Sequence, residues 1–174
     1  MDAALTPRWT DETGTTLIET AFASGILLVV LVGLLSMGAV ATALTENHGH
    51  LSARTAEYAQ DKMEQLLSLK FGDAQSNTTS FPTATSGGTG LAVGGSSDPA
   101  APELDYTDYL DQDGKLLCPC TAEPPEHWFY KRVWQITTVS ATLKEVTVSA
   151  TVSRAVANAF APKATLVALK SDPF

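Results

Sequence analysis

The stretch Asp11–Leu35, DETGTTLIETAFASGILLVVLVGLL, decides how this chain is organised. It opens a run from Ala21 to Leu44 that contains no Asp, Glu, Lys or Arg. A bilayer core is crossed by roughly 20 consecutive apolar residues in a helix. A soluble core helix of this length is rarely apolar on every side. We therefore predict a transmembrane helix over residues 15–44.

A cleaved secretory signal peptide is the main alternative reading of this run. Signal peptides usually have a positive flank and an apolar region of about 7–15 residues. Here the apolar run is longer, and the flank over residues 1–14 carries Arg8 against Asp2, Asp11 and Glu12. Both features disfavour a signal peptide.

Beyond the apolar run, we expect the helix to continue in amphipathic form, so that it covers residues 15–71. Lys70 and Gly72 form a plausible C-terminal stop. One face of this second half repeats apolar residues at helical spacing, which predicts that it packs against a partner. These residues are Ala56, Ala59, Met63 and Leu66.

Residues 72–174 are expected to form a separate head. Its first part, 73–102, is rich in Gly, Ser, Thr and Pro and predicts a loop or partly disordered segment. Asp113-Gly114 between apolar segments predicts a hairpin. The aspartates around this turn do not fit a calcium-binding loop, because Tyr109 and Cys120 stand where such a loop needs acids.

The remaining head sequence predicts β-strands. HWFYKRVWQITTV, 127–139, is dense in aromatic and β-branched residues. KEVTVSATVSR, 144–154, alternates with a period of two, which predicts one buried face and one solvent-facing face. ATLVALK, 164–170, fits a closing strand. A helix followed by antiparallel strands indicates an α+β fold.

Charge and cysteine content restrict the function classes. The net charge of −8 gives no basic footprint for phosphate backbones, so we expect no nucleic-acid partner. Cys118 and Cys120, the two cysteines, are compatible with a local disulfide or with two free thiols. A metal site would need more ligands than His127 adds, so we predict no metal and no cofactor.

The segment GTTLIE, Gly14–Glu19, followed by the apolar helix, resembles the N-terminus of type IV prepilins and type II secretion pseudopilins. In that family, a prepilin peptidase cuts after the glycine and methylates the new amino terminus. The resemblance places the cut between Gly14 and Thr15. It leaves methylation open, because Phe or Met usually stands where Thr15 does. It also assigns Glu19 to filament assembly, where this glutamate pairs with a neighbouring subunit's amino terminus.

The resemblance continues in RTAEYAQDKMEQLLSLKFG, Arg54–Gly72, which is similar to a helix of minor pilins of the pilus-modification type and of the I-type minor pseudopilin. It implies a type IV pilin-like fold and a structural subunit of a pilus or pseudopilus. The implied partners are the prepilin peptidase, other pilins or pseudopilins and an inner-membrane assembly platform. The implied location is the bacterial inner membrane, with an extracytoplasmic head, and later a periplasmic or cell-surface filament.

Two other functions remain open on the sequence. A single-pass membrane protein with an extracytoplasmic β-rich sensor or binding domain would keep its leader, residues 1–14, uncleaved. An enzyme would need a nucleophile–base set, a phosphate loop or a metal cluster, and the spacing of the residues supports none of these. Glu19 is an acid within the predicted transmembrane helix, and such acids are usually retained for a function. Its position therefore favours the pilin or pseudopilin subunit over these two functions.

Overall fold

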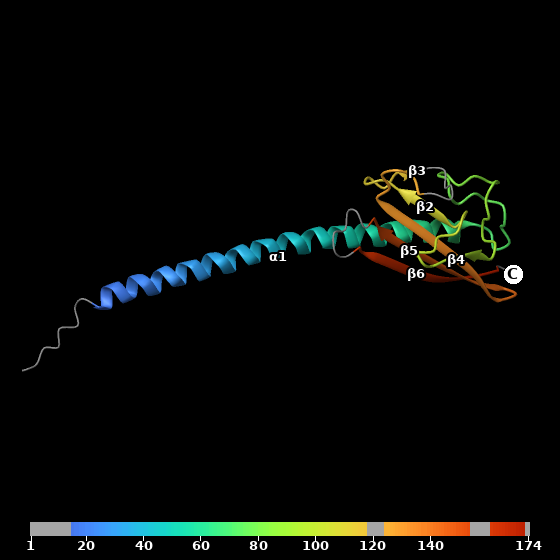
Figure 1. The fold of residues 1–174 in the computed structure, drawn as a ribbon. Helices are drawn as coiled ribbons and strands as arrows, with labels where there is room; N and C mark the ends of the chain where they lie inside the picture. The colour runs from blue at the N-terminus through green and yellow to red at the C-terminus, as the bar shows by residue number, and fades with distance from the viewer. Residues whose placement is uncertain (1–14, 118–123, 154–160, 173–174) are drawn as a thin grey trace, which may run out of the picture. The chain divides into compact units, whose positions relative to one another are not determined.

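The computed structural model describes residues 15–117, 124–153 and 161–172. The chain divides into an N-terminal unit, Met1–Glu46, and a C-terminal unit, Asn47–Phe174, and each is treated by itself. One helix, α1 (Thr15–Ser68), contributes to both units (Figure 1). The expected α+β content is confirmed, since the described residues hold one long helix and an antiparallel sheet.

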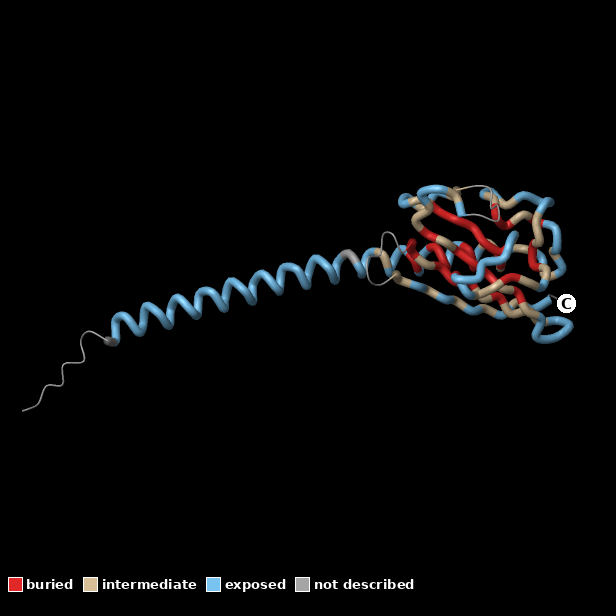
Figure 2. The backbone as a smooth tube through the Cα atoms, viewed as in Figure 1, coloured by how far each residue is buried: buried red, intermediate tan, exposed pale blue. Residues whose placement is uncertain are grey.

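In the N-terminal unit, α1 is apolar and solvent-exposed on all sides. Every residue over 16–46 is exposed, as Figure 2 shows in pale blue. Among the described residues, α1 is the one helix long and apolar enough to cross a membrane. Four of its hydroxyl side chains, those of Thr20, Ser36, Thr42 and Thr45, donate to carbonyls four residues earlier. These polar side chains are therefore satisfied within the helix.

The C-terminal unit contains a six-stranded sheet in which each described pairing is antiparallel. The strand order is β3-β2-β4-β5-β6, and β1 also pairs with β4. The strands are β1 (Gly94–Gly95), β2 (Thr107–Leu110), β3 (Leu116–Leu117), β4 (Tyr130–Ser140), β5 (Leu143–Val152) and β6 (Lys163–Ser171). β4 and β5 form the longest ladder, from Tyr130 opposite Val152 to Ser140 opposite Leu143.

The core lies between α1 and one face of this sheet. The apolar stripe predicted on α1 is confirmed at Ala59, Met63 and Leu66, which are buried, and wrong at Ala56, which is exposed. These three residues pack with Trp134 and other side chains of β4, β5 and β6. The cluster also includes Leu91, Tyr106, Ile136, Val146, Val148 and Ala150.

The alternating pattern in β5 is confirmed on its inner face, where Val146, Val148, Ala150 and Val152 are buried. On its outer face, the expectation of a wet surface is wrong at Ser149, which is fully buried. Its hydroxyl shares a hydrogen bond of 2.9 Å with the hydroxyl of Thr165 on β6. A hydrogen-bonded hydroxyl can be buried at little cost. The alternation of apolar and polar residues therefore could not reveal that Ser149 is buried.

The Gly/Ser/Thr-rich segment is more structured than its composition predicts. Gly94 and Gly95 form β1 against β4. A side chain at Gly95 would lie 2.2 Å from the carbonyl oxygen of Trp134, and its φ of 83° also favours glycine. Farther back, Asp73 Oδ1 accepts hydrogen bonds from the backbone of Gln75 and Ser76. Such local bonds give the segment an ordered path without a large apolar core.

α1 ends at Ser68, three residues before the predicted end at residue 71. Two lysines of the sheet then satisfy carbonyl oxygens at and after this end. Lys170 of β6 donates to the carbonyl of Leu67, and Lys144 of β5 donates to that of Phe71. Positive groups here also complement the partial negative charge of the helix C-terminus.

Candidate functional site

Glu19 lies on the first turns of α1 in the N-terminal unit. It is exposed, and apolar side chains surround it along the chain, with Leu17 77% and Phe22 68% exposed. A carboxylate at this position would be costly in lipid unless another group meets it. Among the described residues, no ion pair or side-chain hydrogen bond involves Glu19.

The structure describes one of the remaining residues of the predicted processing site and cysteine pair, Thr15. Thr15 is the first residue of α1. Gly14, Cys118 and Cys120 lie outside the described residues. Over the described ranges, no group of three or more His, Cys, Asp or Glu side chains is placed to hold a metal ion.

The C-terminal unit contains a second candidate site, built on a buried ion network of Lys62, Asp108 and Arg132. Asp108, on β2, lies opposite Arg132, on β4, in the strand register. Arg132 donates from Nε and Nη2 to the two carboxylate oxygens, at 2.7 and 2.8 Å. Lys62 Nζ of α1 approaches the same carboxylate at 2.8 Å. The side chains of Lys62 and Asp108 have no solvent exposure.

This network is closed by further contacts that compensate its burial. Lys62 also donates to Gln65 Oε1 at 2.9 Å and to the carbonyl of Thr78, and it lies 4.0 Å from the ring centroid of Trp134. Arg132 Nη1 contacts the carbonyl of Tyr58 at 3.4 Å. A buried ion pair needs such additional partners to offset desolvation.

Burial alone would raise the pKa of Asp108, because a charged carboxylate is desolvated there. The guanidinium of Arg132 and the ammonium of Lys62 outweigh that effect and hold the pKa of Asp108 below its usual value. The carboxylate therefore stays ionised at neutral pH, and the network keeps its structural role.

Sequence reasoning missed this network. The sequence patterns place Asp108 among the aspartates around the predicted turn and Arg132 within the predicted strand 127–139, and neither pattern pairs the two. A signal for Lys62 exists, since it lies three residues after Ala59 and four before Leu66, on the buried stripe of α1. Lysine is rarely fully buried without a partner, so the stripe itself implies an acid on the facing strand.

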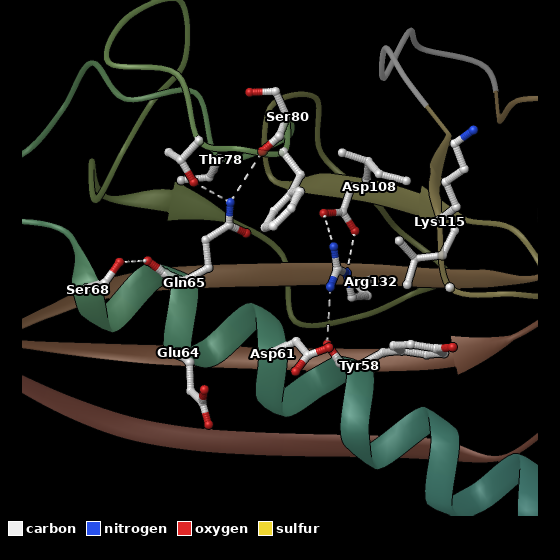
Figure 3. Close-up of a pocket in the computed structure, with 15 residues that line it drawn as sticks. Tyr58, Asp61, Glu64, Gln65, Ser68, Thr78, Ser80, Asp108, Lys115 and Arg132 are labelled. Atoms are coloured by element: carbon white, nitrogen blue, oxygen red, sulfur yellow. Dashed lines mark hydrogen bonds and ion pairs between the residues drawn. The ribbon is translucent and has the colours of Figure 1, made fainter.

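A cavity of about 890 Å³ lies next to the ion network, as Figure 3 shows. Its walls come from α1, the loop 78–83 and the turn that joins β2 to β3, together with residues of strands β2 and β4. Asp108 and Arg132 are part of its lining. The other lining residues are Tyr58, Asp61, Glu64, Gln65, Ser68, Thr78, Ser80, Phe81, Thr83, Leu110, Gly114, Lys115 and Leu116.

Two features fix the shape of this cavity. Gln65 points from α1 to the loop, where its amide donates to Thr83 Oγ1 at 2.5 Å and to the carbonyl of Ser80 at 3.4 Å (Figure 3). The predicted hairpin at Asp113-Gly114 is confirmed by the antiparallel pairing of β2 with β3. Gly114 has a φ of 83°, and a side chain there would lie 2.3 Å from Tyr58 Oη. The turn can therefore approach α1 closely.

Comparisons with protein-family models, with curated proteins and with solved structures give no match for this chain.

Proposed function

We propose that this chain is a minor pilin or pseudopilin, a structural subunit that assembles through its N-terminal helix into a type IV pilus or a type II secretion pseudopilus. The observation that carries the proposal is Glu19, a lone acid near the start of an apolar helix and five residues after Gly14. Few functions explain a carboxylate at that place in a membrane-spanning segment.

The exposed surface of the N-terminal unit supports the proposal. Large apolar side chains are 49–77% exposed along α1 from Leu17 to Leu44. A contiguous apolar surface of this extent needs lipid or protein to cover it. In the proposed cycle, lipid covers it in the inner membrane, and the helices of neighbouring subunits replace the lipid in the filament.

Within this proposal, Gly14, Thr15 and Glu19 have defined roles. The prepilin peptidase cuts between Gly14 and Thr15, which frees an amino group. Glu19 of one subunit then pairs with the amino terminus of its neighbour. In an environment of low dielectric constant this pairing is strong and therefore sets the axial register between helices. The head stays outside the cytoplasm, on the filament surface or tip.

One observation favours a second function, a membrane-anchored binding protein. The cavity of about 890 Å³ in the C-terminal unit has a size typical of small-molecule sites. This function requires no cleavage after Gly14 and no pairing by Glu19, so processing distinguishes the two.

Mass spectrometry of the full chain, produced with and without a prepilin peptidase, tests the proposal. The expected result is a peptide that begins at Thr15, with or without an added methyl group, only when the peptidase is present. Gly14→Leu is the matched control, because it removes the processing site and should restore the intact leader. An intact leader in the wild-type chain under both conditions would overturn the pilin proposal and favour the binding protein.

A further inference from the structure

We propose that the cavity between α1, the loop 78–83 and the β2–β3 turn binds a neutral, hydroxyl-rich ligand, of the class of a short oligosaccharide. This proposal does not depend on how the N-terminus is processed. It rests on the charge balance, the polar groups and the apolar surface of the cavity.

The charges that line the cavity disfavour an ionic ligand of either sign. Asp61 and Glu64 of α1 are exposed and would repel an anion. Lys115 of the turn is exposed and would repel a cation. Asp108 and Arg132 neutralise each other, because Arg132 donates two hydrogen bonds to the Asp108 carboxylate. A neutral ligand avoids both repulsions, and specificity depends on such unfavourable contacts with the wrong partner.

The polar side chains in the lining offer both donors and acceptors. The carboxylate of Asp61 accepts and Lys115 donates. The hydroxyl of Ser68 donates to the carbonyl of Gln65 and can accept from a ligand. In addition, Thr78 is 1% exposed, and its hydroxyl has no hydrogen-bond partner among the described residues. A ligand hydroxyl is also both donor and acceptor, so many hydroxyls on one ligand match this mixed lining.

The cavity also presents an aromatic surface. Phe81 is 84% exposed, more than any other large apolar side chain in the described part of the chain. It lines the same cavity as Tyr58 on the opposite wall, which belongs to α1. An oligosaccharide carries C–H groups on its ring faces beside its hydroxyls. Such faces can pack on an aromatic ring while the hydroxyls bond to the rim.

The walls are held before any ligand arrives. Gln65 anchors the loop to α1, and the ammonium of Lys62 holds both Gln65 and the carbonyl of Thr78. Gly114 allows the turn to meet Tyr58. Because these contacts fix all three segments, binding requires little ordering of the protein.

The test uses the full chain in phosphatidylcholine nanodiscs, since many detergents carry sugar head groups. Three neutral trisaccharides, maltotriose, cellotriose and N,N′,N″-triacetylchitotriose, are titrated to about 10 mM, and binding is followed by saturation-transfer NMR. Trigalacturonate and trilysine serve as the anionic and cationic comparators, and empty nanodiscs give the background. We expect saturable binding of at least one neutral trisaccharide and weaker binding of both charged probes.

Variants locate the site. Phe81→Ala and Asp61→Asn replace exposed side chains and should leave the fold intact, as circular dichroism would show. Phe81→Ala should weaken binding at least about tenfold. Leu104→Ala is the matched control, since Leu104 is 58% exposed and does not line the cavity. Three results would each overturn the proposal: no saturable binding of any neutral trisaccharide, tighter binding of a charged probe, or binding that neither cavity variant changes.

Discussion

Arg132 holds Asp108 through two parallel hydrogen bonds, from Nε to Oδ1 at 2.7 Å and from Nη2 to Oδ2 at 2.8 Å. Lys62 reaches the same carboxylate from α1, so a single buried acid joins the helix to β2 and β4. Because both cations depend on this acid, the network fixes the position of residues 58–65 of α1 against the sheet.

Asp108→Asn should destabilise the C-terminal unit by about 3–5 kcal/mol, because it leaves Lys62 and Arg132 buried without their counter-ion. Urea unfolding of the full chain, followed by tryptophan fluorescence, measures the loss. Asp113→Asn, at an exposed position of the β2–β3 turn, is the control and should change stability by less than about 0.5 kcal/mol. Equal losses in the two variants would contradict a structural role of the network.

Stability should fall in acid because of the same carboxylate. The pKa of Asp108 in the folded chain lies below its ordinary value of 3.8. Its contribution to stability is therefore complete above about pH 4–5, and it is lost as the pH falls from there through the folded-state pKa. Unfolding free energies measured from pH 7 down to pH 3 should show this loss in the wild type. In Asp108→Asn the slope over that range should be smaller.

Leu66→Ala should cost about 2–5 kcal/mol, since Leu66 has no solvent exposure and packs within the cluster around Trp134. Leu104→Ala removes the same atoms from an exposed position and should cost far less. The comparison of their urea midpoints tests whether the second half of α1 is part of the core. Similar midpoints would show that it is not.

Lys170→Met should destabilise the end of α1 by about 1 kcal/mol, because it removes the donor to the carbonyl of Leu67 but keeps the apolar stem. Burial lowers the pKa of Lys170, because the charged ammonium is partly desolvated. The hydrogen bond to the carbonyl of Leu67 offsets this desolvation. Hydrogen exchange of the last turn of α1 should become faster. Lys163→Met, at an exposed position of the same strand, is expected to leave that exchange unchanged.

Glu19→Gln should leave cleavage after Gly14 intact and reduce incorporation into filaments at least about tenfold, because the register-setting charge is lost. The readout is the fraction of processed chain that sediments with filaments from cells that carry the assembly machinery. Glu46→Gln, an exposed acid beyond the apolar run, controls for loss of charge alone. Normal incorporation of Glu19→Gln would refute the pairing of Glu19.

Several elements were predictable because their signals are local. The apolar run to Leu44, the period of two in β5 and the turn at Gly114 depend on residues that are close in the chain. The helical stripe was predictable at Ala59 and Leu66 for the same reason. The prediction failed at Ala56, because the small alanine side chain is compatible with either the buried or the exposed face of a helix.

Local sequence patterns were enough to predict the apolar helix with Glu19 near its start, the antiparallel strands and the hairpin. The burial of Lys62, the contact between Asp108 and Arg132, and the place of the loop 78–83 in a cavity wall depend on how distant segments pack. A charge can be buried only where opposite charges from such segments come together. Lys62 and Arg132 are far apart in the chain, and their common partner Asp108 is specified by the strand register and not by any local pattern.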